Sequence, residues 1–245
     1  MVDISVVINC HNEGRQLKQT ITSVRDNIEA CKHESISVEL IVVRDSADLS
    51  TIDYTEQDCK KDARLLDAQL SDLGLARNFG ASAARGKYLA FIDGDDLWCR
   101  SWLISAFKQA EAYRSRSILH TETAVLFDAE EKIWRLQDSE SADFDRSILL
   151  DYNPWYPSSF GRRDIYLEFP YCPVDLEGGF FYEDWHWNCE TLYAGIPHKT
   201  VPETFHCYRT KSIWKEPSLL AAASLTQCIM PATKLFSLGY QNTNR

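Results

Sequence analysis

The sequence lacks several features that define whole classes of protein. No window reaches the roughly 18 apolar residues that a membrane-spanning helix requires. The start, MVDISVVINC, has neither the basic region nor the long apolar region of a secretory signal peptide. The eight cysteines are scattered, without a C-x-x-C pair or zinc-like spacing, and we interpret them as reduced thiols. These absences predict a cytoplasmic protein.

An excess of positive charge is also missing. The chain has 26 Lys and Arg residues against 36 Asp and Glu residues, a formal net charge of −10. Nonspecific affinity for nucleic acid comes mainly from clustered Lys and Arg, so we expect no nucleic-acid partner. A negatively charged small ligand stays compatible with this composition if a cation mediates its binding.

What is present in the first hundred residues is an alternation of β-branched runs with helical patterns, which is typical of a parallel α/β sheet. Apolar residues at 17, 21, 24 and 28 predict a helix from about Glu13 to Ala30. A second helix is expected before residue 88, where Ala81, Ala83 and Ala84 permit close approach to the sheet. The predicted strands are 4–10, 38–43, 63–68 and 88–93.

The second part of the chain has a different texture. A helix is predicted over 101–114 and a hairpin over 123–128 and 132–136. Aromatic residues and prolines then crowd the interval 152–187. We therefore divide the chain functionally near residue 115, without an independent domain boundary.

The stretch YLAFIDGDDLW places Asp93, Asp95 and Asp96 directly after a strand. Ligands of open α/β sheets bind at the carboxyl ends of the strands, so these carboxylates are expected in the binding crevice. Three neighbouring carboxylates repel one another unless solvent or a cation compensates, and Mg²⁺ or Mn²⁺ suits such oxygen ligands. The alternative is an acidic turn that caps the following helix.

Four segments in order resemble the family 2 glycosyltransferases. They are SVVINCHNE, ELIVVRDSADLST, GLARNFGASAARGKYLAFIDGDDLW and YEDWHWNCETLYAGIPHKTVPE, and together they span about residues 3–210. The resemblance implies the GT-A fold, a Rossmann-like and mostly parallel central sheet flanked by helices, with an irregular acceptor side. We expect a glycosyltransferase domain over 1–215, with a nucleotide-binding half 1–115 and an acceptor half 116–215. A C-terminal helical extension would follow over 216–245.

The resemblance also implies a nucleotide-sugar donor whose diphosphate is neutralised by a metal at an Asp-x-Asp motif, here Asp93-Gly94-Asp95. Asp93 would lie near the ribose or sugar, and Asp95 would hold Mn²⁺ or Mg²⁺ on the diphosphate. Relatives carry a Tyr-Arg-x-His arrangement near the end of the domain, whereas this chain reads Tyr-Arg-Thr-Lys. Either His206 reaches the metal from a shifted position, or Lys211 and Arg209 supply positive charge directly.

Further donor contacts follow from the same resemblance. Asp45 is the candidate for the nucleobase or ribose, although Arg44 stands where the family has a second acid and could instead form a structural salt bridge. Asn9, His11 and Glu13 lie at the end of the first strand, where the family places polar residues near the base and ribose. Arg77 would pair with a phosphate or with Asp93, or would only brace the acidic loop.

The segment YEDWHW supplies the candidate catalytic acids. By resemblance Asp184 is the base that takes the proton of the acceptor hydroxyl, with Glu183 beside it, although acids in a first helical turn can also serve only the helix. Trp185 is the aromatic residue chosen for acceptor binding, over Trp155, Tyr156 and Trp187, because aromatic faces pack on sugar rings. Gly179 would let backbone approach the acceptor closely.

These features predict a metal-dependent, inverting transfer of a hexosyl or N-acetylhexosaminyl group from a UDP-sugar to a saccharide or lipid-linked saccharide. The setting implied by the family is surface polysaccharide synthesis. A sugar nucleotidyltransferase is the rival enzyme, but NCHNEGRQ has one glycine where that class needs a glycine-rich loop. A silent saccharide-binding module is the other alternative. The segment 217–236 is expected to be a packing helix, or a contact with a membrane surface or polymerase module.

Overall fold

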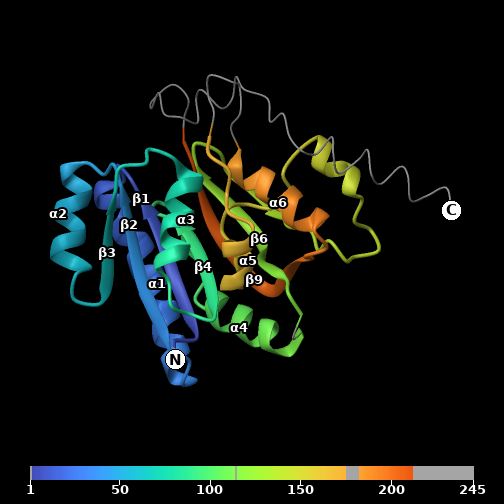
Figure 1. Cartoon of the computed structure of the whole chain (residues 1–245), viewed down its shortest axis with the longest axis horizontal. Helices are drawn as coiled ribbons and strands as arrows, with labels where there is room; N and C mark the ends of the chain where they lie inside the picture. Colours follow the sequence, from blue (N-terminus) through green and yellow to red (C-terminus); the bar gives the residue numbers. More distant parts are fainter. Residues whose placement is uncertain (1, 114, 175–181, 212–245) are drawn as a thin grey trace.

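The computed structural model describes residues 2–113, 115–174 and 182–211, and shows a nine-stranded sheet with helices on both faces (Figure 1). The strand order is β3-β2-β1-β4-β8-β6-β9-β5, and β7 pairs with β6 beside this path. The strands are β1 Ile4–Cys10, β2 Val38–Asp45, β3 Ala63–Ala68, β4 Tyr88–Asp93, β5 Leu97–Trp98, β6 Ile118–Asp128, β7 Lys132–Arg135, β8 Phe160–Arg162 and β9 His198–Thr210. The α-helices are α1 Leu17–His33, α2 Leu49–Asp58, α3 Leu73–Ala83, α4 Trp102–Tyr113, α5 Arg163–Glu168 and α6 Glu183–Tyr193, with short 3-10 helices η1 Gly14–Gln16 and η2 Arg146–Leu150.

The first four strands confirm the expected parallel sheet. β3, β2, β1 and β4 all run in the same direction, and Asn9 of β1 lies opposite both Val43 of β2 and Asp93 of β4. β8 then pairs antiparallel with β4 and β6, while β9 runs parallel to β6. The sheet is therefore mostly parallel, as the predicted fold class requires. The predicted second strand was too short, because β2 continues to Asp45.

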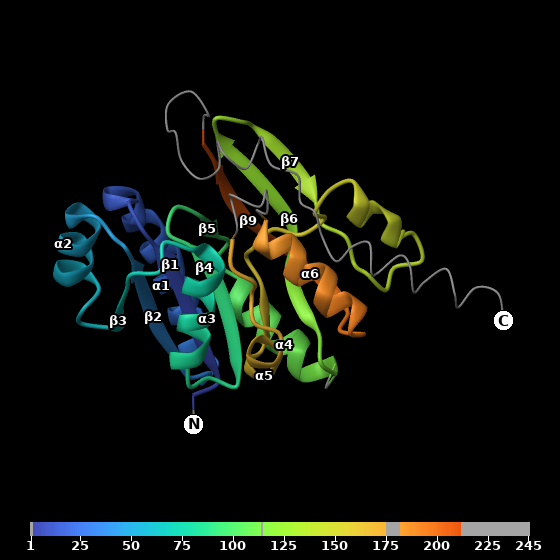
Figure 2. The ribbon, with the colours of Figure 1, turned by 45° about the horizontal axis from the view of Figure 1, so that its top comes forward.

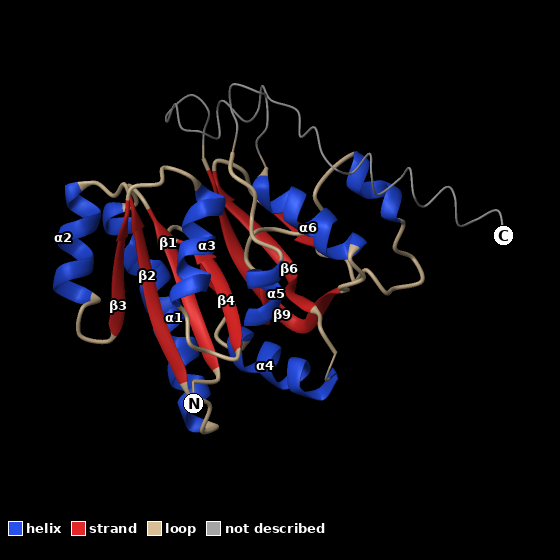
Figure 3. Cartoon of the chain, viewed as in Figure 1, coloured by secondary structure: helices blue, strands red, loops and turns tan. Residues whose placement is uncertain are grey.

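Helices on both faces explain why the central strands have continuous apolar runs. All seven residues of β1 are buried. Ile4, Val6 and Ile8 pack in a cluster with α1 and α4, whereas Val7 packs in a cluster with α3, α5 and α6. These two helical layers lie in front of and behind the sheet (Figure 3). A strand buried on both faces needs no polar alternation.

Helix α3 approaches the sheet closely at Gly80, one residue before the small residues expected to do so. A Cβ at Gly80 would lie 2.5 Å from Val7 Cγ1 and 3.2 Å from Val43 Cγ2. We expect Gly80→Val to lower the free energy of unfolding by about 2–3 kcal/mol, because the added methyl groups overpack a rigid core. Urea unfolding followed by circular dichroism measures this.

Ser82→Val is the matched control, since it places the same side chain on the exposed side of the same helix. Its unfolding free energy should change by only about 0.5 kcal/mol. Equal effects of the two substitutions would show that helix propensity, rather than contact with β1, sets the cost.

The irregular half of the chain builds a third cluster around Trp155, which is 1% exposed. Trp155 stacks on His198 at 4.2 Å between ring centroids, and His198 Nδ1 lies 2.9 Å from His120 Nε2. Burial lowers the pKa of His120 to about 3, so it is neutral at physiological pH. Trp187 is equally buried and stacks on Tyr166. Trp155 and Trp187 are therefore core residues.

Two expectations concern residues outside the described ranges. The extension 216–245 with its helix 217–236 lies there, and so does Gly179. Among the helices of the described ranges, none combines the length and the apolar content that crossing a bilayer demands.

Candidate active site

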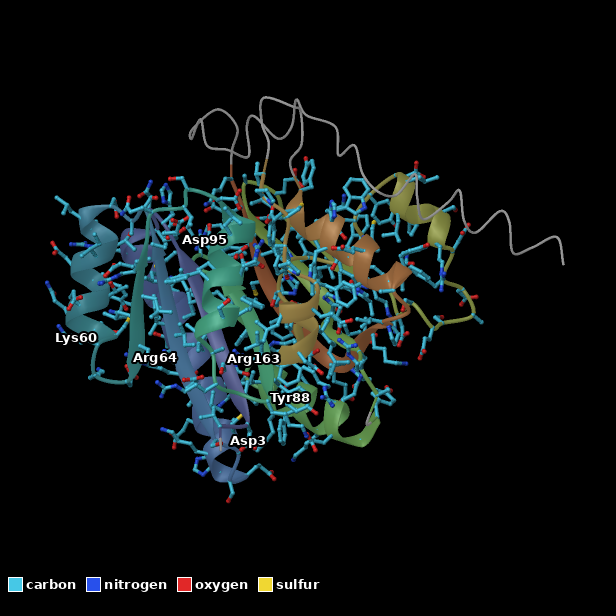
Figure 4. All side chains as sticks on the ribbon, viewed as in Figure 1. Asp3, Lys60, Arg64, Tyr88, Asp95 and Arg163 are labelled. Atoms are coloured by element: carbon cyan, nitrogen blue, oxygen red, sulfur yellow. The ribbon has the colours of Figure 1, made fainter. Side chains whose placement is uncertain are left out.

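Polar side chains end three adjacent strands on the face covered by α3. Val43, Val7 and Phe91 of β2, β1 and β4 pack against this helix. Because side chains alternate along a strand, Asp45, Asn9 and Asp93, each two residues further on, point to the same face. Figure 4 places the neighbouring Asp95 at this carboxyl-terminal edge of the sheet.

Arg77 of α3 joins the two acidic motifs. Its side chain is 1% exposed, and Nη2 donates to Asp93 Oδ1 at 3.1 Å and to Oδ2 at 3.2 Å. Its Nη1 donates to Glu183 Oε1 at the start of α6. Burial alone would lower the pKa of Arg77, but the Asp93 and Glu183 carboxylates outweigh it and raise the pKa. The buried guanidinium of Arg77 therefore connects β4, α3 and α6. These contacts show Arg77 as a brace of the acidic loop, which was one of the roles expected from the sequence.

Asp184 lies beside this bridge in the first turn of α6. Its Oδ2 accepts a hydrogen bond from Asn153 Nδ2 at 3.0 Å. Burial, followed by the charge of Glu183, raises the pKa of Asp184 to about 7. A carboxylate that changes protonation near neutral pH is suited to accept a proton in a general-base step.

The end of β9 brings positive charge to the Asp-x-Asp loop. Lys211 Nζ lies 3.0 Å from Asp95 Oδ2, and the Asp95 side chain is 9% exposed. The backbone N–H of Arg209 donates to Asp96 Oδ1 at 2.9 Å. Burial and the charge of Asp95 raise the pKa of Asp96, which is 2% exposed. Lys211 is thus in contact with the carboxylate expected to face the diphosphate.

His206 occupies a different place in β9. It pairs with Trp98 in the sheet register and is fully buried, with Nδ1 2.7 Å from the Thr121 hydroxyl. Burial lowers the pKa of His206 to about 4. Within the described ranges, no three His, Cys, Asp or Glu side chains are grouped as a metal site. The fit to a divalent cation therefore depends on Asp95, whose oxygens are of the kind that Mg²⁺ and Mn²⁺ prefer.

Asp45 shapes the loop that leads into α3. Its Oδ1 accepts from the backbone N–H groups of Leu70 at 2.6 Å and Ser71 at 3.0 Å, and its Oδ2 accepts from Asp72 at 3.1 Å. Asp72 in turn caps α3 by accepting from the Leu75 N–H. Hydrogen bonds from three backbone N–H groups give Asp45 a structural role at this edge. Its contact with a nucleobase stays a prediction.

Arg44 forms the structural salt bridge that the sequence analysis gave as one interpretation. Its guanidinium donates to both carboxylate oxygens of Asp67 at 2.7 Å and to Glu56 at 2.9 Å. Its side chain is 6% exposed and faces the opposite side of β2 from Asp45. Arg44, the residue that departs from the family pattern, therefore takes part in an ion-pair network.

The loop after β1 supplies the remaining polar groups of the edge. Asn9 is 5% exposed, and neither its amide nitrogen nor its amide oxygen has a hydrogen-bond partner among the described residues. His11 Nδ1 lies 2.6 Å from the Asp45 carbonyl oxygen, and the His11 N–H donates to Glu13. Gly94 packs so tightly that a Cβ would lie 3.1 Å from the Asn9 carbonyl oxygen. The acidic loop is thus seated directly on the end of β1.

Trp185 is half-buried in α6, with its ring edge-on to Tyr182 at 6.1 Å. Its indole N–H is buried without a hydrogen-bond partner in the described part of the chain. The sequence did not point to Asn153, which donates to Asp184, or to Asn188, which donates to Asn153. No motif or periodicity in the irregular segment marks them.

The fold is that of the GT-A class of glycosyltransferases. The chain superposes on Staphylococcus aureus TarS 1–349 in complex with UDP-GlcNAc with a TM-score of 0.68 at 14% identity, over 86% of this chain and 59% of that one. The complex of TarS 1–349 with UDP gives a TM-score of 0.67 at 13% identity. The family model for glycosyl transferase family 2 matches residues 5–170. The chain belongs to glycosyl transferase family 2.

Curated relatives match over shorter stretches. A putative glycosyltransferase, EpsH, of Bacillus subtilis (strain 168) is 35% identical over 80 residues, which are 31% of this chain and 23% of EpsH. A putative teichuronic acid biosynthesis glycosyltransferase, TuaG, of the same organism is 32% identical over 117 residues, 46% of this chain and 43% of TuaG. The matched part of the chain thus spans less than half the length of these relatives.

Proposed function

We propose that this chain transfers a hexosyl or N-acetylhexosaminyl group from a UDP-sugar to a saccharide or lipid-linked saccharide, with inversion at the anomeric carbon. The observation that carries the proposal is the Arg77 bridge, because it holds the donor-side acid Asp93 and the helix of the candidate base Asp184 at one edge of the sheet. The TarS complexes with UDP-GlcNAc and UDP support the choice of donor.

In this mechanism Asp184 takes the proton of the acceptor hydroxyl as that oxygen attacks the anomeric carbon, and the nucleoside diphosphate leaves on the opposite face. Lys211, in contact with Asp95, is placed to stabilise the negative charge that develops on the leaving diphosphate. Asp95, with Asp93 nearby, would hold Mn²⁺ or Mg²⁺, which when bound supplies further positive charge to that diphosphate.

The acceptor side includes the half-buried Trp185, whose aromatic face would pack on a sugar ring. The name of TuaG, a putative teichuronic acid biosynthesis glycosyltransferase, supports a role in polysaccharide synthesis. A cytoplasmic location, with contact to a membrane or polymerase module through residues 217–236, completes the proposal.

A panel of nucleotide sugars tests the donor assignment. UDP-glucose, UDP-galactose and UDP-N-acetylglucosamine, each with Mn²⁺, are compared with GDP-mannose in thermal unfolding. A ligand that binds only the folded state raises Tm, by linkage. We expect a rise with at least one UDP-sugar and none with GDP-mannose. The reverse pattern, or no rise with any donor, would contradict the proposal.

Asp95→Asn tests the metal and diphosphate assignment. The substitution keeps the shape of the side chain but removes the charge that would hold a cation. We expect the affinity for UDP in the presence of Mn²⁺ to fall by about tenfold to 100-fold, the loss of a charged ligand contact of about 1.5–3 kcal/mol. Isothermal titration calorimetry with UDP, with and without Mn²⁺, gives the measurement.

Asp53→Asn is the matched control, because Asp53 is exposed on α2 at the far edge of the sheet (Figure 1). It removes the same charge and should leave UDP binding unchanged. If Asp95→Asn binds UDP as the wild type does, both with and without Mn²⁺, the metal assignment to Asp95 is wrong.

A further inference from the structure

We propose, on the basis of the function proposed above, that Asn153 is the positioning residue of the base Asp184. It lies in the segment between η2 and β8, which passes beside α6 (Figure 2). Its Nδ2 donates to Asp184 Oδ2 at 3.0 Å. The bond fixes the orientation of the carboxylate and stabilises its ionised form, because an amide N–H interacts more strongly with a charged than with a neutral acceptor.

The orientation of the Asn153 amide is set by two donors on its other side. Asn188 Nδ2 donates to Asn153 Oδ1 at 3.0 Å, and the Trp155 backbone N–H donates to the same oxygen at 3.3 Å. Because the Trp155 backbone N–H can only donate, the amide oxygen of Asn153 must face it and the amide nitrogen must face Asp184. The flipped orientation would set donor against donor.

The elements that carry this arrangement are rigid. Asn188 lies four residues after Asp184, so both side chains are on the same face of α6. Asn188 is 2% exposed and Trp155 is 1% exposed in the third cluster. Asn153 is therefore held between a helix and a core tryptophan, which is the pre-organisation that a general base requires.

Several ionisable groups also affect the protonation of Asp184, in addition to the hydrogen bond from Asn153. Glu183 on the same helix and Asp93 on β4 disfavour its ionised form, whereas Arg77 on α3 favours it. Its charge is also felt by Tyr171 after α5, by Cys189 on α6 and by Tyr208 on β9. Each of these groups stays in place when Asn153 alone is changed.

Asn153→Ala removes the donor to Asp184. We expect the pKa of Asp184 to rise by about one unit, because the lost bond favoured the ionised form. The measurement is a pH titration of the protein with ¹³C-labelled aspartate carboxyl carbons, in which Asp184→Asn identifies the resonance. This readout does not depend on knowing the acceptor. An unchanged midpoint in a folded variant would overturn the positioning role.

Asn153→Asp covers the case in which the alanine variant does not fold. It keeps the shape of the side chain and the oxygen that accepts from Asn188 and Trp155, and it replaces the donating amide –NH2 by a carboxylate oxygen next to Asp184. The pKa of Asp184 should rise further than in Asn153→Ala. Asp145→Ala, which removes the N-terminal cap of η2 just before this segment, is the control and should leave the titration unchanged.

Activity then separates this proposal from the proposed function. UDP release with water as the acceptor is followed against pH for the UDP-sugar that raises Tm most. In Asn153→Ala the acid limb should move to higher pH by the shift seen in the titration, with the rate partly recovered at high pH. If Asn153→Ala shifts the titration but Asp184→Asn is fully active, Asp184 is not the base, although its hydrogen bond with Asn153 still stands. An inactive Asp184→Asn combined with an unmoved Asn153→Ala profile would reject only the positioning role.

Discussion

Asp184→Asn is expected to lower turnover by about 10²–10⁴-fold, the range that a positioned general base contributes. The amide has nearly the shape of the carboxylate, and its oxygen can still accept the hydrogen bond of Asn153. It cannot take a proton from the acceptor hydroxyl. UDP binding should be unchanged, because the donor contacts lie at the strand ends and on Lys211. Steady-state kinetics together with UDP calorimetry separate the two effects.

The pH dependence sharpens this expectation. Burial and the charge of Glu183 raise the pKa of Asp184 to about 7, so the wild-type enzyme should gain activity as pH rises through this value. Because the pKa is higher in the folded than in the unfolded state, the ionised carboxylate costs stability at pH 8, and Asp184→Asn should not lower Tm there. An inactive variant that is also unfolded would not support the assignment.

Glu190→Gln is the matched control for the base, since Glu190 lies in the last turn of the same helix. It should retain wild-type turnover. If Asp184→Asn also retained turnover, Asp184 would not be the base, and Glu183 or a group outside the described residues would have to take the proton.

Arg77→Met is expected to lower the free energy of unfolding by about 3–5 kcal/mol, the cost of removing one partner from a buried ion pair. Methionine fills much of the arginine volume but leaves Asp93 and Glu183 without the cation that separates them. Urea unfolding measures the loss. UDP release should fall as well, because α6 with Asp184 is no longer tied to β4.

Two further variants isolate the cause. Arg77→Met combined with Glu183→Gln should recover part of the lost stability, because only one carboxylate then remains uncompensated. Arg25→Met is the surface control. Arg25 pairs with Asp58 and Asp62 at a side-chain exposure of 27%, and its loss should cost only about 1 kcal/mol. Equal costs for Arg25→Met and Arg77→Met would mean that burial does not strengthen the bridge.

Much of the fold could be predicted because its information is local. β4 has a continuous apolar run, β1 and β2 are rich in β-branched residues, and the apolar stripe of α1 recurs with a helical period. Elements whose signals are short were missed. β8 has only three residues and α5 only six, too few for a period to be recognised. α2 was also missed, although Asp48 accepts from the Thr51 N–H as a recognisable N-terminal cap.

The sequence by itself determined which elements and chemical groups are present: a parallel sheet, an acidic loop at a strand end, and a second acidic pair that opens a later helix. Only the tertiary structure decided how these groups meet. Arg77 is 16 residues from Asp93 and 106 from Glu183, and Asn153 is 31 residues from Asp184. Such pairings have no local period, because they are set by the packing of α3 and α6 on the sheet. That packing places the Arg77 guanidinium between two acids and the Asn153 amide beside Asp184.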